Sequence, residues 1–168
     1  ANGGIFLSGK FDQLQQFTPF SALASAFNKY CDILLMDGGF TSATEVASKL
    51  RAALGQDACH LVNVIPNLRN IIGDYEDDNS FDEGCVDAQK RLQYLMSQFV
   101  KAISSSSTSH IMLFLDDLQW ADGASIEVIN QLLLPSGSPN ESKHFFFLGC
   151  CRGDEMSADH SVWRMIKS

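Results

Sequence analysis

The stretch His110-Ile-Met-Leu-Phe-Leu-Asp-Asp-Leu-Gln-Trp-Ala-Asp122 decides the fold of this chain. An apolar run from Ile111 to Leu115 stands directly before Asp116 and Asp117. Such a run is typical of a strand buried on both faces of a parallel sheet. Ligands of open parallel sheets bind beyond the carboxyl ends of the strands, so the acid pair is expected in a ligand crevice. Aspartate also ends strands and opens turns, and the pair alone is a weak motif.

Strands and helices alternate on both sides of this stretch. Asp122 is expected to cap a helix that continues to Leu133, and Phe145–Cys151 is expected to form another buried strand before Arg152. Upstream, Ile5–Leu7 is a short apolar strand. Apolar residues at helical spacing predict helices over residues 19–35, 42–54 and 85–103. This alternation predicts an α/β domain with a parallel sheet.

Local signals divide the rest of the chain. Pro19 fits the first turn of its helix, and Ser42 with Glu45 fits a capping box at the start of the next one. Residues 61–72, interrupted by Pro66, predict a short helix or turn. Connectors are expected at 74–84, 104–109 and 135–139, where acidic, serine and proline-rich stretches lie.

Composition narrows the class of protein. The 168 residues suit one domain, and a net charge of −8 without a basic patch gives no sign of nucleic-acid binding. The five cysteines are scattered, which favours free thiols in a reducing compartment over a disulfide framework or a zinc site. No apolar run is long enough for a membrane span, and no secretory signal begins the chain, so a cytoplasmic location is expected.

The residues after the acid pair make the motif specific. Leu115–Asp122 resembles the Walker B segment of AAA-related and STAND ATPases, especially the origin-recognition-type AAA domain of large multidomain kinases and regulators. Further stretches resemble that family in the same order. They are Gly9–Gln13, Pro19–Leu23 with Ala26-Phe27, Val64–Leu68 with Ile71–Gly73, Gln89–Leu92 and Phe147–Arg152.

The resemblance implies a partial P-loop NTPase three-layer sandwich over residues 1–168. Strands two, three and four of the family would be present, and the first and fifth strands absent. The Walker B segment would lie at 111–117 and the sensor strand at 145–152. A sheet without its first strand is expected to expose an edge.

The resemblance also assigns roles at the acid pair. Asp116 would hold Mg²⁺ with ATP, and Asp117 would act beside it as general base on the attacking water, so both count as catalytic. Arg152 would contact the γ-phosphate as a sensor of the nucleotide. The alternative for Arg152 is a surface ion pair with Asp154 or Glu155.

A second glycine-lysine stretch is expected to be a decoy. Gly4-Ile-Phe-Leu-Ser-Gly9-Lys10 matches most of the phosphate-binding P-loop pattern, but Phe11 stands where Mg²⁺ needs a hydroxyl. Its Ile-Phe-Leu core also reads as a strand. By resemblance the true P-loop, the Walker A segment, lies upstream of Ala1, and this chain alone is expected to bind Mg-ATP weakly or not at all.

Two functions remain open at this point. One is an ATP-binding and ATP-hydrolysing regulatory domain in a multidomain signalling protein, with adjacent domains as partners and oligomerisation undecided. The other is a truncated or degenerate domain that acts as a scaffold or interaction module without nucleotide.

Overall fold

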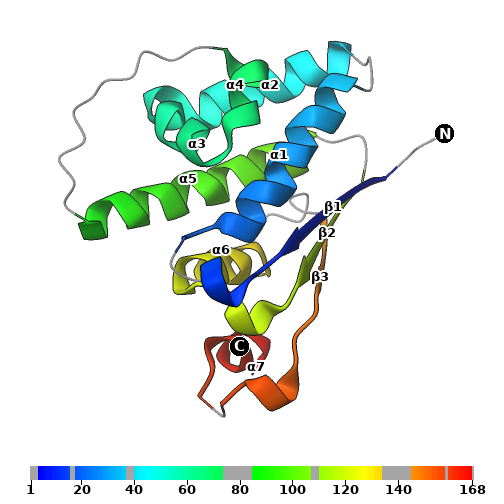
Figure 1. The fold of residues 1–168 in the computed structure, drawn as a ribbon. Helices are drawn as coiled ribbons and strands as arrows, with labels where there is room; N and C mark the ends of the chain where they lie inside the picture. Colours follow the sequence, from blue (N-terminus) through cyan, green and yellow to red (C-terminus); the bar gives the residue numbers. More distant parts are fainter. Residues whose placement is uncertain are drawn as a thin grey trace.

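A three-stranded parallel sheet forms one side of the molecule. The computed structural model describes residues 4–15, 18–36, 40–73, 85–106, 110–133, 145–157 and 159–167. Strands β1 (Ile5–Lys10), β2 (Ile111–Asp116) and β3 (Phe145–Gly149) lie in the order β1-β2-β3 (Figure 1). Ile5 pairs with Ile111, and Ile111 with Phe145. The predicted α/β fold with a parallel sheet is therefore confirmed, and it is consistent with part of a P-loop NTPase fold.

Helices fill the connections between the strands. Between β1 and β2 lie α1 (Ser21–Met36), α2 (Phe40–Leu54), α3 (Ala58–Val64), α4 (Arg69–Ile72) and α5 (Cys85–Ser106). Helix α6 (Gly123–Leu133) links β2 to β3, and α7 (Ser161–Lys167) follows β3. Short 3₁₀ turns occur at η1 (Gln13–Gln15), η2 (Gly55–Asp57), η3 (Pro66–Leu68), η4 (Leu118–Trp120) and η5 (Gly153–Glu155).

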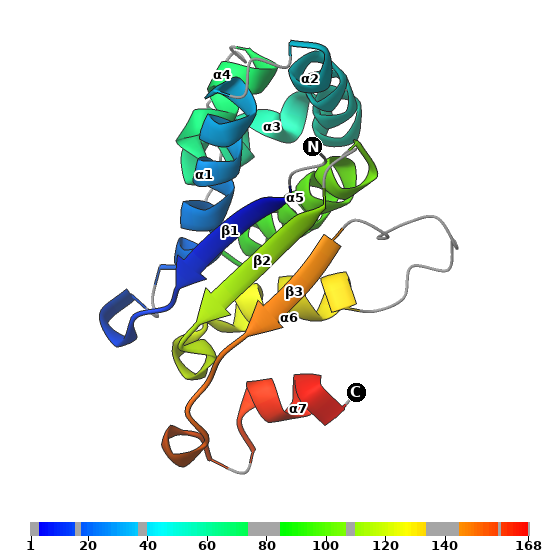
Figure 2. The same ribbon diagram turned by 90° about the vertical axis from the view of Figure 1, so that its right-hand side faces the viewer.

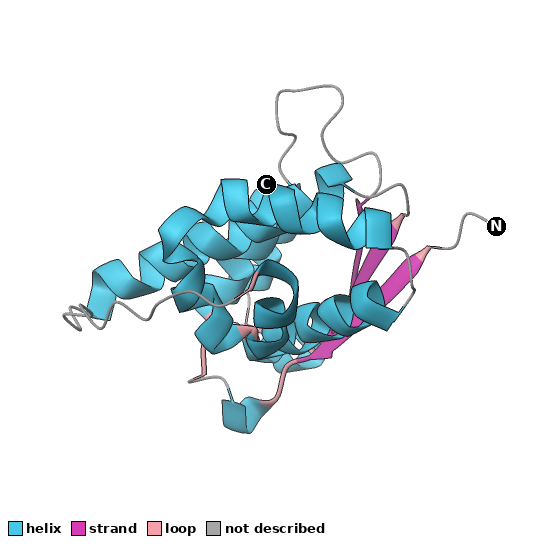
Figure 3. Ribbon diagram, turned by 90° about the horizontal axis from the view of Figure 1, so that it is seen from above, coloured by secondary structure: helices cyan, strands magenta, loops and turns pink. Residues whose placement is uncertain are grey.

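The crossover helices cover one face of the sheet. A parallel crossover is nearly always right-handed, and successive strands here are added in one direction. Both crossovers must therefore pass over the same face. Figure 2 shows the strands in front of α1, α5 and α6, and Figure 3 shows from above that the helices gather on one side of the strands.

The other face of the sheet is apolar and open to solvent in the described residues. It carries Phe6 at 58% exposure, Phe146 at 60%, Leu148 at 46% and Met112 at 39%. The Phe6 and Phe114 rings stack there, with their centroids 6.4 Å apart. The prediction that residues 111–115 and 145–151 are buried strands is therefore wrong for this face, because same-direction crossovers leave it uncovered.

The core lies between the helices and the covered face of the sheet. Leu7, Leu113 and Leu115 point from the strands into it and are fully buried. Phe27 of α1 and Phe99 of α5 meet edge to face, with their ring centroids 5.1 Å apart. Aromatic pairs in this geometry add to the stabilisation from apolar burial, so this contact ties α1 to α5.

Several helix ends differ from the predicted ones. Phe20 has a positive φ of 64°, so α1 begins at Ser21 and Pro19 lies in the preceding turn. Helix α2 begins at Phe40, which places Ser42 inside the helix and makes the capping box wrong. Helix α5 continues to Ser106, three residues beyond the predicted end. The serine run extends the helix there, and the side chain of Ser104 packs against the core.

The other predicted segments agree with the structure in part. Residues 61–72 form the end of α3, then η3 and α4, as a short helical segment was predicted. Strand β3 ends at Gly149, two residues before the predicted end. The predicted connectors at 74–84 and 135–139, and residues 107–109, lie outside the described residues. None of the helices in the described residues has the length and apolar character needed to cross a membrane.

The four described cysteines are free thiols in different surroundings. Cys31 in α1 is fully buried, and burial raises its pKa to about 12. Cys150 is exposed after β3. A thiolate is the species that reacts with alkylating agents. At pH 8 iodoacetamide is therefore expected to label Cys150 first, and to reach Cys31 only as the chain unfolds. Peptide mass spectrometry over time measures this, and equal labelling rates would contradict the burial of α1.

Candidate nucleotide-binding site

The site begins where β2 ends. Asp116 is the last residue of β2, and Asp117 follows in the left-handed conformation with φ 54° and ψ 46°. Aspartate tolerates this conformation better than most residues, and here it reverses the direction of the side chain. The Asp116 side chain is 39% exposed, whereas that of Asp117 is 11% exposed. The two neighbouring carboxylates therefore have different surroundings and can have different roles.

Lys10 reaches the acid pair from the neighbouring strand. It is the last residue of β1 and pairs in register with Asp116. Its Nζ lies 3.1 Å from Oδ2 of Asp117 and 3.9 Å from Oδ2 of Asp116. The ammonium thus stands between two carboxylates that would otherwise repel each other.

Arg152 approaches Asp117 from the other side. Its Nε lies 3.6 Å from Oδ1 of Asp117, and its Nη1 donates to Oε1 of Glu155 at 2.7 Å. The predicted proximity to the acid pair and the alternative ion pair with Glu155 therefore occur together. The Arg152 side chain is 59% exposed, so it remains accessible to a ligand.

Asp117 is strongly held as an ionised acceptor. The hydrogen bond from Lys10, followed by that from Gln119, holds the pKa of Asp117 below its usual value. The same contact with Asp117 raises the pKa of Lys10, and Glu155 raises the pKa of Arg152. A carboxylate with a lowered pKa is a weak base. In this arrangement Asp117 orients donors more readily than it accepts a proton.

Asp116 has the character of a magnesium ligand. Its Oδ1 accepts the backbone N–H of Asp117 at 3.0 Å, and its Oδ2 has only the distant Lys10 contact. Mg²⁺ is bound by oxygen, and it usually keeps several waters beside one or two carboxylates and the phosphates of a nucleotide. The half-exposed Asp116 fits that mode. No cluster of three or more metal-ligating side chains occurs among the described residues.

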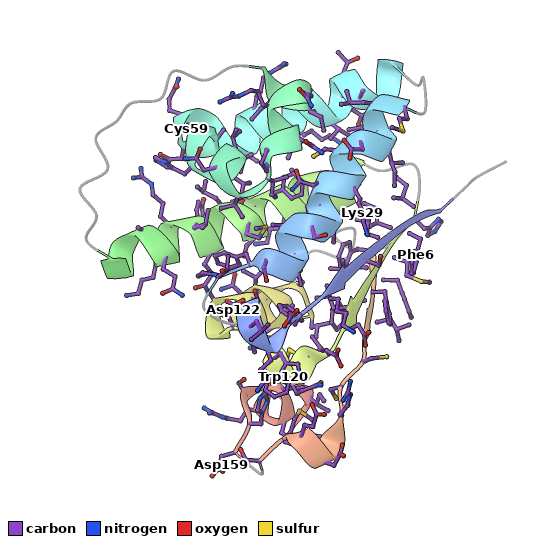
Figure 4. The ribbon with its side chains drawn as sticks, in the orientation of Figure 1. Phe6, Lys29, Cys59, Trp120, Asp122 and Asp159 are labelled. Atoms are coloured by element: carbon purple, nitrogen blue, oxygen red, sulfur yellow. The ribbon has the colours of Figure 1, made fainter. Side chains whose placement is uncertain are left out.

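A polar cavity of about 360 Å³ opens beside Asp116. Lys10 and Lys29 line it together with three serines, Gly9 and Phe114. Lys29 lies on α1 beside the edge of β1, as Figure 4 shows, and its Nζ is 3.4 Å from the Ser8 hydroxyl. Asp116 therefore adjoins open space that two lysines line, whereas Asp117 is buried beside it.

Asp122 secures the turn below the site. It precedes α6 and accepts the backbone N–H of Ser125 at 2.9 Å, which confirms the predicted cap. Its other oxygen accepts the N–H of Phe20 at 3.2 Å, which holds the turn before α1. One carboxylate thus fixes the starts of two helices that flank the carboxyl edge of the sheet.

Lys10 and Gln119 were missed from the sequence as partners of Asp117, and Glu155 was expected only as an alternative ion-pair partner of Arg152. Lys10 was considered only as a phosphate-binding lysine of a P-loop. In the structure Ile5–Lys10 is one strand, which agrees with the rejection of the P-loop match but is three residues longer than the predicted strand Ile5–Leu7. Aligning the carboxyl ends of the parallel strands would have placed Lys10 beside Asp116. The side-chain partners of Gln119 had no sequence signal.

Comparisons with known proteins agree with the α/β fold. The family described as AAA ATPase domain matches residues 1–146. Hybrid signal transduction histidine kinase G of Dictyostelium discoideum is 28% identical over 131 residues, which are 76% of this chain and 4% of that protein. The chain thus spans a small part of that relative's length. No solved structure matches significantly. Because the family match covers most of its length, the chain belongs to the AAA ATPase domain family.

Proposed function

We propose that this chain is part of an ATP-binding and ATP-hydrolysing regulatory domain in a multidomain signalling protein. The observation that carries the proposal is the convergence of Asp116, Asp117 and Arg152 at the carboxyl edge of a parallel sheet. Carboxylates for a metal ion and a cation for a phosphate are the groups that phosphoryl transfer requires. The histidine kinase similarity supports the signalling context.

Asp116 is the proposed magnesium ligand. Bound with ATP, Mg²⁺ would neutralise charge on the phosphate oxygens. Asp116 offers Oδ2 for this role, because its other oxygen is held by the Asp117 N–H. The proposal requires a P-loop to hold the phosphates, and the glycine-lysine stretch before Phe11 does not supply it, because Ile5–Lys10 is a strand.

Asp117 is the proposed group that acts on the attacking water. In the structure its oxygens accept from Lys10 and Gln119, and movement of one of these donors would open further room for a water. Lys10 is the mobile candidate, because its side chain is 66% exposed and Gln119 is buried. Arg152, whose side chain is exposed, is proposed to contact the γ-phosphate.

ATP occupancy is proposed to act on neighbouring domains of a cytoplasmic protein. The open apolar face of the sheet, which includes Phe6 and Phe146, also favours a second candidate function. In that alternative the chain is a packing or scaffold module that has lost nucleotide binding. The ion pairs of Lys10 and Arg152 with Asp117 fit this alternative as well, because they balance the charge of the carboxylate without a bound ligand.

Asp116→Asn in the full-length protein separates the two candidates. Loss of the anionic ligand is expected to weaken Mg-ATP binding about 10- to 100-fold, the scale of one lost charged contact. Isothermal titration with Mg-ATP and with metal-free ATP measures this. A matched control is Asp12→Asn, since Asp12 is an exposed aspartate that only accepts the Leu14 N–H. If the wild-type protein binds no ATP, the scaffold alternative stands.

A further inference from the structure

Gln119 is a buried amide at the centre of the site's hydrogen bonds. It lies in η4 and is 5% exposed. Its Nε2 donates to Oδ1 of Asp117 at 3.1 Å and to Oε2 of Glu155 at 3.0 Å. Its Oε1 accepts the backbone N–H of Arg152 at 3.1 Å. One side chain therefore joins the end of β2 to the turn that follows β3.

The orientation of this amide follows from its neighbours. An amide nitrogen has two hydrogens to donate, and each of them meets one carboxylate. A flipped amide would turn its oxygen toward both carboxylates and its NH₂ toward the Arg152 N–H. That arrangement is repulsive on both sides, so a single orientation is stable. Both amide hydrogens and one acceptor position of the amide oxygen are thus used toward the site.

The backbone of Gln119 is held as well. Its carbonyl oxygen lies 3.2 Å from Nε2 of His160, just before α7. Nδ1 of the same ring accepts the N–H of Val162 at 3.3 Å, which makes Nε2 the donor to Gln119. The turn that carries Gln119 is therefore fixed from the side of α7, and its side chain cannot follow a movement of Arg152 freely.

We propose that Gln119 is a positioning residue that holds the Arg152–Glu155 turn against Asp117. Arg152 reaches Asp117 directly through a long ion-pair contact of 3.6 Å, in which the arginine side chain is exposed and Asp117 is buried. A long ion pair with an exposed partner is weak on its own. The buried amide of Gln119 makes shorter hydrogen bonds, and these fix the backbone position from which the Arg152 side chain extends. This inference deepens the proposed function, since it rests on Arg152 and Asp117 acting at one ATP site.

No other common side chain makes these three bonds. Glutamate would bring a third carboxylate beside Asp117 and Glu155, and methionine of similar volume would leave their donor positions empty. The Glu155 carboxylate receives both the Gln119 amide and the Arg152 guanidinium. Gln119 and Arg152 thus share one acceptor, and loss of the amide removes one of its two fixed contacts.

Hydrogen exchange of the Arg152 backbone amide tests this directly. In Gln119→Met the amide loses its acceptor and is expected to exchange about tenfold faster, the scale of one hydrogen bond. The Leu118 amide serves as an internal reference, because it donates to the Cys150 carbonyl and not to Gln119. Equal Arg152 exchange in wild type and Gln119→Met, normalised to Leu118, would overturn the proposal.

Two further variants keep the test specific. Gln131→Met is the matched control, because Gln131 accepts a bond from Ser97 away from the site and should leave Arg152 exchange unchanged. Gln119→Glu is expected to loosen the turn by repulsion, and adding Glu155→Gln returns a donor and should restore part of the protection. A double variant no better protected than Gln119→Glu would also count against the proposal, even if Gln119→Met fails to fold.

The exchange measurement needs no nucleotide, so it can succeed where the proposed function fails. Turnover in the full-length protein provides the complementary readout. There Gln119→Met is expected to lower kcat without a matching change in ATP affinity, the pattern of a group that positions the reacting site. A wild-type protein without ATP turnover would refute the proposed function and leave the exchange result intact.

Discussion

Gly9→Ala is expected to lower the free energy of unfolding by about 3 kcal/mol, the upper end of the cost of adding a methylene to a packed core. A β-carbon at Gly9 would stand 2.3 Å from the Ala22 carbonyl oxygen and 2.9 Å from its carbon. These are backbone atoms of α1, so no side-chain rotation relieves the contact. Because total stabilities are about 5–15 kcal/mol, this is a large fraction. Urea denaturation followed by circular dichroism measures it.

Gly123→Ala is the matched control for this substitution. Gly123 begins α6, and nothing lies within 4 Å of an added β-carbon. Alanine is the better helix residue, so a change within about 0.5 kcal/mol or a small stabilisation is expected. Unfolding of both variants at the same urea concentration as wild type would contradict the close contact between the backbones of α1 and β1 at Gly9. Destabilisation of Gly9→Ala alone would instead support a packing role of Gly9 against the backbone of Ala22.

The sheet could be predicted because its signals are local. The apolar run before Asp116 and the short run at Ile5–Leu7 each specify a strand without reference to the rest of the chain. Burial could not be read from the same runs. Whether Met112 or Phe146 is covered depends on which face the crossovers take, and that follows from strand order rather than from strand composition.

Helix starts depended on distant contacts. The left-handed Phe20 delays α1, and its N–H is held by Asp122, a residue 102 positions away. No pattern near Pro19 contains that information. The capping signal at Ser42 was overridden in a similar way, since α2 starts at Phe40 and adds an earlier turn.

The candidate site was predicted in outline and missed in its connections. The carboxyl-edge rule placed Asp116 and Asp117 in a ligand crevice, the family resemblance added Arg152, and the three residues do lie together. Their roles toward metal, water and phosphate remain proposals. The Gln119 amide donates one hydrogen bond to Asp117, which is close in sequence. It donates another to Glu155 of η5, which is 36 positions away. A buried amide between such partners becomes visible only once β2 and β3 are side by side.

Asp117→Asn in the full-length protein is expected to lower ATP turnover by about 10²–10⁴-fold, the usual contribution of a general base. Asparagine tolerates the left-handed conformation, and its amide oxygen can still accept from Gln119 or Lys10. The fold and the ATP affinity should therefore change little. Turnover and equilibrium ATP binding, measured on the same preparation, separate loss of chemistry from loss of binding.

The outcome of Asp117→Asn depends on what Lys10 does to the acid. If Lys10 stays bound to Asp117 during turnover, it keeps the pKa of the carboxylate low, and loss of this weak base would change kcat little. If Lys10 moves away when nucleotide binds, Asp117 becomes a stronger base and its loss lowers kcat. Lys10→Met removes the Lys10 contact, while Gln119 and Arg152 still lie beside Asp117, and in the second case it is expected to leave kcat equal or raise it. A fall in ATP affinity rather than kcat in Asp117→Asn would instead make Asp117 a second ligand of the metal, sharing that role with Asp116.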